Sequence, residues 1–251
     1  QLCLQLFCQE EFLRRLENSK YAENFVLKGG LFIYSITEFD SRVTVDIDFL
    51  LKKVPNTPER LKSVMEEIIN TPTDNNFIKF EIRNVAPIAV AKKYAGIGVS
   101  LIAQINNTKT PVSIDLGVGD IIVPNQERRR IPTQLNDFSA PIVNTYSLET
   151  TIAEKIDAIL SLMEFSSRMK DYYDIYYLAN KFDFDGAILT KALKRTFENI
   201  ITAVIPNTIV ISIHGLILTT IFLPRIRSTV THMHAIPVEH FILVHINIPA
   251  A

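Results

Sequence analysis

Two aspartates, Asp46 and Asp48, stand at alternate positions of the strand-like segment TVDIDFLL. Because successive side chains of a strand point to opposite faces, both carboxylates share one face, and Val45, Ile47 and Phe49 share the other. Two acids held side by side repel each other unless a cation neutralises them, and Mg²⁺ prefers such oxygen ligands. The spacing therefore predicts a Mg²⁺ site, with an ordinary solvated strand face as the alternative.

A glycine pair, Gly29 and Gly30, lies in LKGG between a short apolar run and the helix-like segment LFIYSI. Glycines let backbone amides approach a phosphate closely, and a following helix would direct the positive end of its dipole at that phosphate. The pair therefore indicates a phosphate-binding turn, with a plain turn as the alternative.

A third carboxylate for the same metal site is Asp115, in the alternating segment VSIDLGVGD. Asp120 follows Gly119 in that segment and is more typical of a turn or a strand end. We therefore expect Asp115, rather than Asp120, to join Asp46 and Asp48.

The elements that must position these residues follow from the hydrophobic pattern. Residues 1–20 have the spacing of an amphipathic helix, and residues 24–141 contain short apolar runs between turn residues, with a helical interval near 58–70. Helical periodicity returns over 147–197. This order predicts an α+β fold, with a mixed sheet and helices as core and a helical C-terminal part. The predicted domains are a core at 1–142, a helical subdomain at 143–200 and an atypical tail at 201–251.

The tail differs in composition from the rest of the chain. It contains all five histidines but one acidic residue, Glu239, and no lysine. Either it is a small β-rich appendage, or it is a segment that was not naturally selected, such as a shifted reading frame. We assign no metal site to its histidines and expect no membrane helix in its uncharged run, 200–223.

The overall composition is that of a globular protein, with 47% hydrophobic and 21% charged residues. A net charge of −1 excludes a strongly basic protein that coats nucleic acid. The cysteines, Cys3 and Cys8, cannot build a disulfide framework, so we expect a reducing, cytoplasmic location. We also expect no signal peptide.

The sequence resembles a known family in five segments, in the order FLRRLENSKYAENFVLKGG, SRVTVDIDFL, VSIDLGVGDIIVP, YSLETTIAEKIDAIL and SRMKDYYDIYYL. These segments are similar to the AbiEii/AbiGii toxin family of nucleotidyltransferases, over about residues 9 to 200; the stretch after about residue 207 does not match. The resemblance implies a polymerase-β-like core, a nucleoside triphosphate donor, Mg²⁺ dependence and a role in abortive infection and type IV toxin–antitoxin systems. In some relatives the acceptor is the 3′ end of tRNA. The resemblance implies a cognate antitoxin that opposes the toxin functionally, and direct contact between the two is not assumed.

The family's functional positions can be transferred to matching positions of this chain. The resemblance assigns the phosphate-binding turn to Gly29 and Gly30, and the metal site to Asp46, Asp48 and Asp115. It assigns a triphosphate-binding lysine to Lys155, for which a solvated helix lysine is the alternative. It assigns an essential acid to Asp171, which could orient Lys155 or the acceptor, and Asp174 on the same helix face could hold that role instead.

Two other functions remain open at the level of sequence: nucleotidyl transfer to a protein hydroxyl, and a non-catalytic nucleotide-binding module on the same fold. Four tyrosines with helical spacing are more typical of packing than of base stacking. They are Tyr172, Tyr173, Tyr176 and Tyr177. The basic run at 128–130 is more typical of a solvated surface than of an RNA contact.

Overall fold

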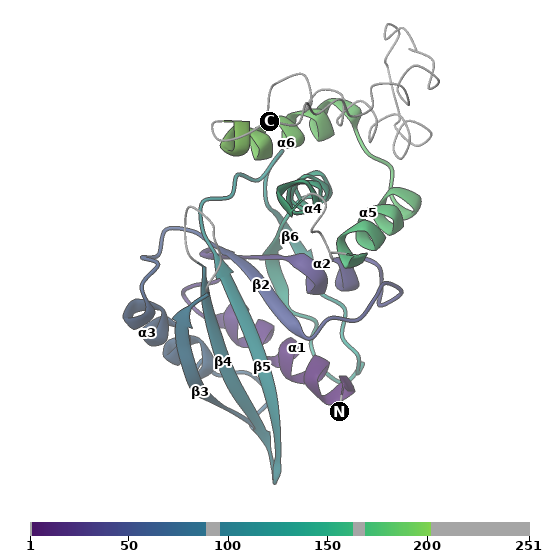
Figure 1. The fold of residues 1–251 in the computed structure, drawn as a ribbon. Coiled ribbons are helices and arrows are strands. Elements are labelled where there is room, and N and C mark those ends of the chain that lie inside the picture. The colour runs from purple at the N-terminus through teal and green to yellow at the C-terminus, as the bar shows by residue number, and fades with distance from the viewer. Residues whose placement is uncertain (1, 89–95, 163–168, 202–251) are drawn as a thin grey trace, which may run out of the picture.

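A computed structural model describes residues 2–88, 96–162 and 169–201 (Figure 1). Its centre is one seven-stranded sheet in the order β3-β4-β5-β2-β1-β7-β6. The strands are β1 (Phe25–Lys28), β2 (Asp46–Leu51), β3 (Ile78–Pro87), β4 (Ile97–Ile105), β5 (Thr108–Gly117), β6 (Glu127–Arg130) and β7 (Ile142–Thr145). The β2–β5 and β1–β7 pairs are parallel and the other four pairs are antiparallel, so the sheet is mixed. The predicted α+β class is confirmed.

Six helices are described around the sheet. They are α1 (Leu2–Asn18), α2 (Gly29–Ile36), α3 (Pro58–Ile69), α4 (Leu148–Leu162), α5 (Met169–Lys181) and α6 (Gly186–Ile201). The helices expected near 1–20 and 58–70 are confirmed. Helix α3 starts where local chemistry favours a start, because the hydroxyl of Thr57 accepts a hydrogen bond from the Arg60 amide and Pro58 occupies the first turn.

One face of the sheet packs on α1 and α3, which also contact each other (Figure 1). Strand β4 shows why it can do so: Ile97, Val99, Leu101 and Ala103 alternate along it and are all buried. Strand β5 alternates in the same way, with Val112, Ile114 and Leu116 buried. The two strands therefore present one apolar face to the helices.

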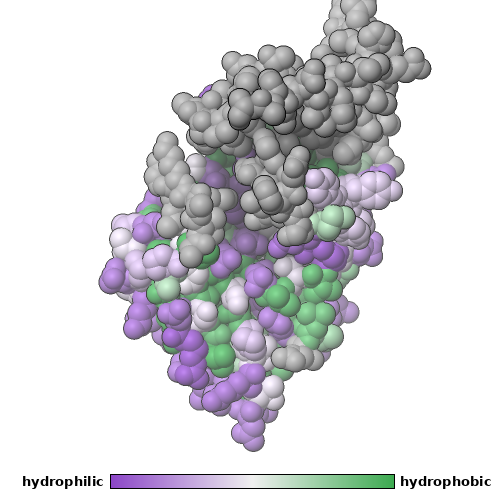
Figure 2. Space-filling view, in the orientation of Figure 1, coloured by the Kyte–Doolittle hydropathy of each residue, from purple (hydrophilic) through white to green (hydrophobic). Residues whose placement is uncertain are grey.

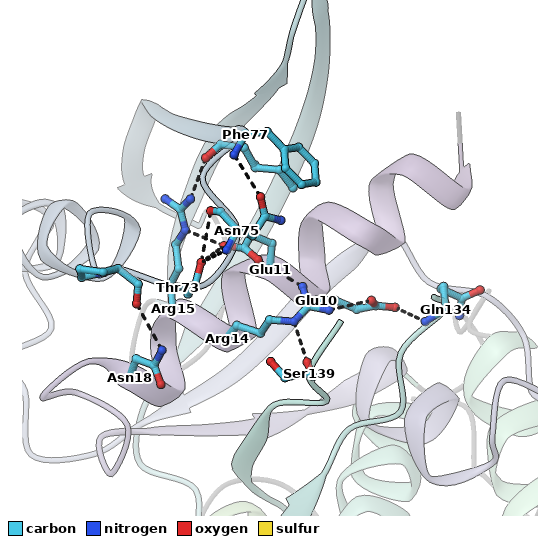
Figure 3. Close-up of polar contacts among 12 residues, drawn as sticks. Glu10, Glu11, Arg14, Arg15, Asn18, Thr73, Asn75, Phe77, Gln134 and Ser139 are labelled. Carbon is cyan, nitrogen blue, oxygen red and sulfur yellow. Dashed lines mark hydrogen bonds and ion pairs between the residues drawn. The ribbon is translucent and has the colours of Figure 1, made fainter. Parts of the chain in front are cut away.

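Helix α1 is buried more completely than an amphipathic pattern predicts, because Glu10, Glu11, Arg14 and Arg15 are also buried. Figure 3 shows how these charges are satisfied. Glu11 pairs with both arginines, while Arg14 donates to the Ser139 carbonyl at 2.7 Å and Arg15 donates to the carbonyls of Ile69 and Ile78. Glu10 accepts from the Gln134 amide at 2.8 Å. The charged residues of α1 therefore fix the loops around the sheet.

Helix α4 packs against α5 and α6 at one end of the sheet (Figure 1). The expected packing role of the α5 tyrosines is wrong for three of the four, because Tyr172, Tyr173 and Tyr176 are 44–66% exposed. Their side of α5 lies opposite the side that carries the buried Asp171 and Asp174.

Two further expectations concern the ends of the chain. The tail, including its histidines and the run at 200–223, lies almost entirely outside the described residues, and the domain division stays a prediction.

Both cysteines are free, Cys3 exposed and Cys8 buried. In the part of the chain that the structure describes, no helix is both long and apolar enough to cross a membrane.

Candidate active site

The three predicted aspartates lie on two neighbouring strands. In the parallel register of β2 and β5, Asp48 lies directly opposite Asp115, and Asp46 lies opposite Ser113. Ile47 and Phe49 are fully buried, whereas Asp46 and Asp115 are exposed and Asp48 is partly buried. The alternation therefore places the three acids on the face of the sheet opposite the buried apolar side chains.

The carboxylates act on one another electrostatically. Burial raises the pKa of Asp48, the charges of Asp115 and Asp46 raise it further, and the charge of Lys28 opposes them. Burial and the charge of Asp46 also raise the pKa of Asp115. A site that resists the ionisation of its own acids gains from a bound cation.

These donors have the chemistry that Mg²⁺ prefers, since they supply carboxylate oxygens alone. Within the described residues, however, no three acidic, histidine or cysteine side chains already converge as a metal-binding group. The three aspartates fit the ion by type and by strand register, and their side chains would have to turn toward one another to hold it.

The glycine pair begins a helix beside Asp48, as its sequence predicts. Helix α2 starts at Gly29, which has a left-handed backbone with φ of +67°. A Cβ on Gly29 would lie 2.1 Å from Oδ2 of Asp48, and one on Gly30 would lie 2.8 Å from the hydroxyl oxygen of Thr44. Glycine is required at the first position both by its backbone and by the close approach of Asp48.

Lys28 forms a cluster that sequence reasoning missed. Its Nζ lies 2.6 Å from Asp120 and 3.1 Å from Glu154, and 3.4 Å from the hydroxyl of the fully buried Tyr146. Asp120 does lie in a loop, as expected, but its carboxylate faces this lysine. The cluster connects β1 with the loop after β5 and with helix α4. Its lysine, Lys28, directly precedes the glycine pair in the sequence.

The electrostatics of the Lys28 cluster are uneven. Burial raises the pKa of Glu154 to about 7, against the opposing charge of Lys28 and with the charge of Asp120 adding to the rise. The pKa of Asp120 is lowered, because Lys28 and hydrogen bonds outweigh the effect of its burial. Asp120 is therefore the firmly ionised partner of Lys28.

Lys155 is buried, so the solvated-lysine interpretation is wrong. Its Nζ lies 2.9 Å from Asp171 and 2.7 Å from Asp174. Asp174 also accepts two hydrogen bonds from Arg42, from Nε at 2.8 Å and from Nη2 at 2.7 Å. The sequence left Asp171 and Asp174 as alternatives, and in the structure both contact Lys155.

The Lys28 cluster lies beside the strand acids, because Lys28 is the register partner of Asp48 across β1 and β2. The charges of Lys28 and Lys155 both lower the pKa of Asp48. In the space-filling view a band of hydrophilic residues lies between α5 and the sheet below it (Figure 2). All predicted site residues belong to this end of the sheet or to α4 and α5 beside it. The additional members are Lys28, Arg42, Asp120, Tyr146 and Glu154.

Two crystal structures of Helicobacter pylori proteins are similar to this chain. One is JHP933, with 17% sequence identity and a TM-score of 0.47, covering 88% of this chain and 84% of that chain. The other, assigned as a nucleotidyltransferase, has 17% identity and a TM-score of 0.45, covering 86% of this chain and 85% of that chain. No curated protein matches the sequence at a significant level.

The sequence matches one protein family over residues 11–231, described as the nucleotidyl transferase AbiEii toxin of type IV toxin–antitoxin systems. The match extends into the tail, so the expectation that the resemblance ends near residue 200 is wrong for residues 201–231. The matched range covers most of the chain and includes nearly all residues of the five motif segments. The chain belongs to the AbiEii family of nucleotidyltransferase toxins.

Proposed function

We propose that this protein transfers a nucleoside monophosphate from a nucleoside triphosphate to the 3′ end of tRNA, in a Mg²⁺-dependent reaction in the cytoplasm. The observation that carries the proposal is the cross-strand pair of Asp48 and Asp115 beside the Gly29 turn. In a toxin of this family, blocking the acceptor end of tRNA would halt translation and growth. A cognate antitoxin would oppose that effect, and a direct contact between the two proteins is not assumed.

In this proposal each residue acts on charge or position. Asp46, Asp48 and Asp115 would hold Mg²⁺, which when bound supplies positive charge to the triphosphate. Backbone amides at Gly29 and Gly30 would bind phosphate oxygens at the start of α2. Lys155 would add positive charge from the wall formed by α4, held in place by Asp171 and Asp174.

The bond changes follow those of nucleotidyl transfer. The terminal ribose hydroxyl oxygen of the acceptor forms a bond to the α-phosphorus, and the bond from that phosphorus to the bridging oxygen of the β-phosphate breaks. Pyrophosphate leaves with the electron pair of that bond. The carboxylate of Asp115, whose pKa is raised by burial and by Asp46, is the group we propose to take up the hydroxyl proton. Positioning and charge neutralisation supply most of the rate in such reactions.

The test is incubation of the purified protein with Mg²⁺, each α-labelled nucleoside triphosphate in turn, and total bacterial tRNA. Asp48→Asn should abolish labelling of tRNA, while Asp137→Asn, a change at an exposed aspartate in the loop between β6 and β7, should leave it intact. Label on protein instead of tRNA would point to a protein hydroxyl as acceptor. Absence of label from every acceptor would favour the non-catalytic nucleotide-binding module.

A further inference from the structure

We propose that Arg42 is a further nucleotide-binding residue, which binds phosphate oxygens of the incoming nucleoside triphosphate and is oriented for this by Asp174. The inference rests on the proposed function and names a binding residue for it. Arg42 lies in the segment between α2 and β2, four residues before Asp46.

The first support is the way Asp174 holds the guanidinium. Nε donates to Oδ1 at 2.8 Å and Nη2 donates to Oδ2 at 2.7 Å, a paired contact that fixes the guanidinium plane. The Asp174 carboxylate itself is fixed, because its side chain is 1% exposed and it also pairs with Lys155. Arg42 is therefore pre-oriented rather than free to rotate.

The second support is the donor capacity that remains. A guanidinium has five N–H donors, and Asp174 uses one on Nε and one on Nη2. Among the described residues, no other acceptor engages the Arg42 side chain. The side chain is 29% exposed, so its remaining donors can reach a ligand from solvent.

The third support is a comparison with the other two cations of the site. Lys155 has a 10% exposed side chain and contacts two aspartates, and Lys28 has a 17% exposed side chain and contacts Asp120 and Glu154. Each lysine therefore has two acidic partners, which leaves its ammonium group fewer donors for a ligand than the guanidinium of Arg42 has. Arg42 has one acidic partner and more exposure, and a planar guanidinium suits phosphate geometry better than an ammonium does.

The fourth support is position. The segment that carries Arg42 also carries Thr44, which lies against Gly30, and leads directly into Asp46. The hydrogen bond with Asp174 is the largest cause that raises the pKa of Arg42, and the charges of Asp171 and Asp48 add to it. Arg42 therefore lies within electrostatic reach of the strand acid beside which the phosphate-binding turn begins.

A purely structural role would make Arg42 a clamp between its own segment and α5. The chain offers a matched control for that role, because Lys181 at the end of α5 pairs with Asp40 of the same segment at 2.9 Å. Asp40→Ala removes this ion pair between the same two parts of the chain without touching Arg42 or Asp174, while the hydrogen bond from Lys181 to the Thr37 carbonyl at 3.1 Å stays.

The experiment measures equilibrium binding of each of the four nucleoside triphosphates, with Mg²⁺ and without acceptor, to the full chain and its variants. Arg42→Ala should weaken the binding of the preferred triphosphate by about tenfold or more, the loss expected for a charged hydrogen-bonding partner. Arg42→Lys should weaken it less, and Asp40→Ala should not change it. Thermal unfolding of each variant, with Arg42→Lys as the milder change, separates loss of binding from loss of folding.

The proposal is overturned if Arg42→Ala binds the triphosphate as tightly as the unchanged protein, or if Asp40→Ala weakens binding equally. It is also overturned if Arg42→Ala raises only the KM for tRNA, because the phosphate would then belong to the acceptor backbone. If the unchanged protein binds none of the four triphosphates, the proposed function fails and this inference fails with it.

Discussion

Gly29 brings its backbone directly against the carboxylate of Asp48, so that a Cβ on Gly29 would lie 2.1 Å from Oδ2. Because the glycine also has a positive φ, any side chain there meets both backbone strain and a steric clash. A side chain at position 29 would therefore displace both the turn that would bind phosphate and the acid that would bind Mg²⁺.

Gly29→Ala should accordingly reduce nucleotidyl transfer by about a hundredfold, since displacement of catalytic groups by about 1 Å has that order of effect. Gly30→Ala should be milder, because its Cβ would meet the Thr44 side chain, which can rotate, and its φ is not left-handed. Labelled transfer and thermal unfolding of both variants provide the comparison. Equal activity of Gly29→Ala and the unchanged protein would show that the turn tolerates a side chain.

Mg²⁺ should raise the melting temperature of the unchanged protein by several degrees, because an ion that binds only the folded state stabilises it. Burial, and after it the charges of neighbouring aspartates, raise the pKa values of Asp48 and Asp115, so a cation bound beside their charged forms would be favourable. Asp48→Asn should lose this shift, and Asp137→Asn should keep it. A shift of the same size in Asp48→Asn would place the ion elsewhere.

Asp115→Asn should separate activity from stability. Removing one of the facing charges should raise the melting temperature slightly in the absence of metal, since like charges on paired strands destabilise the fold. The same change should abolish transfer, because a ligand and a proton acceptor are lost. Thermal unfolding in EDTA and labelled transfer are the two measurements, and a lower melting temperature in EDTA would contradict the account of the site.

The parts of the site that sequence reasoning found are those with local patterns. Alternation placed Asp46 and Asp48 on one face, and the glycine pair marked the start of α2, because each pattern lies within a few residues. The partners of Lys28 and Arg42 could not be found in this way. Asp120 is 92 residues from Lys28, and Asp174 is 132 residues from Arg42, so only the folded chain brings them together.

The fold shows the same division. The strands and helices follow hydrophobic periodicity, so their existence could be predicted from the sequence. The burial of Glu10, Glu11, Arg14 and Arg15 on α1 could not, because it depends on carbonyl groups of distant loops, such as those of Ser139 and Ile78, that satisfy their charges. The exposure of the α5 tyrosines has a similar cause, since it depends on which face of α5 meets α4.

Glu154 should make stability fall as pH rises from about 5 to 8. Burial raises the pKa of Glu154 to about 7 in the folded state. Between its ordinary pKa and about 7, the folded protein therefore binds a proton that the unfolded chain has lost. Stability from this group is present at low pH and is lost as pH rises through about 7. The melting temperature of Glu154→Gln, taken relative to that of the unchanged protein, should therefore rise by a few degrees over this range. A constant difference would mean that Glu154 ionises normally.

Asp174→Asn should destabilise the protein more than Asp171→Asn does. Asp174 pairs with both Arg42 and Lys155 and its side chain is 1% exposed, and Asp171, whose side chain is 6% exposed, also pairs with Lys155. Removing one partner of a buried ion pair typically costs about 3–5 kcal/mol, and the partial exposure of Arg42 should keep its share of the loss smaller. Denaturant unfolding of the two variants measures the difference in the free energy of unfolding. Each substitution removes one charge and keeps the size of the side chain, so each serves as the control for the other. A larger loss in the free energy of unfolding for Asp171→Asn would show that the charge of Lys155 is stabilised chiefly by Asp171.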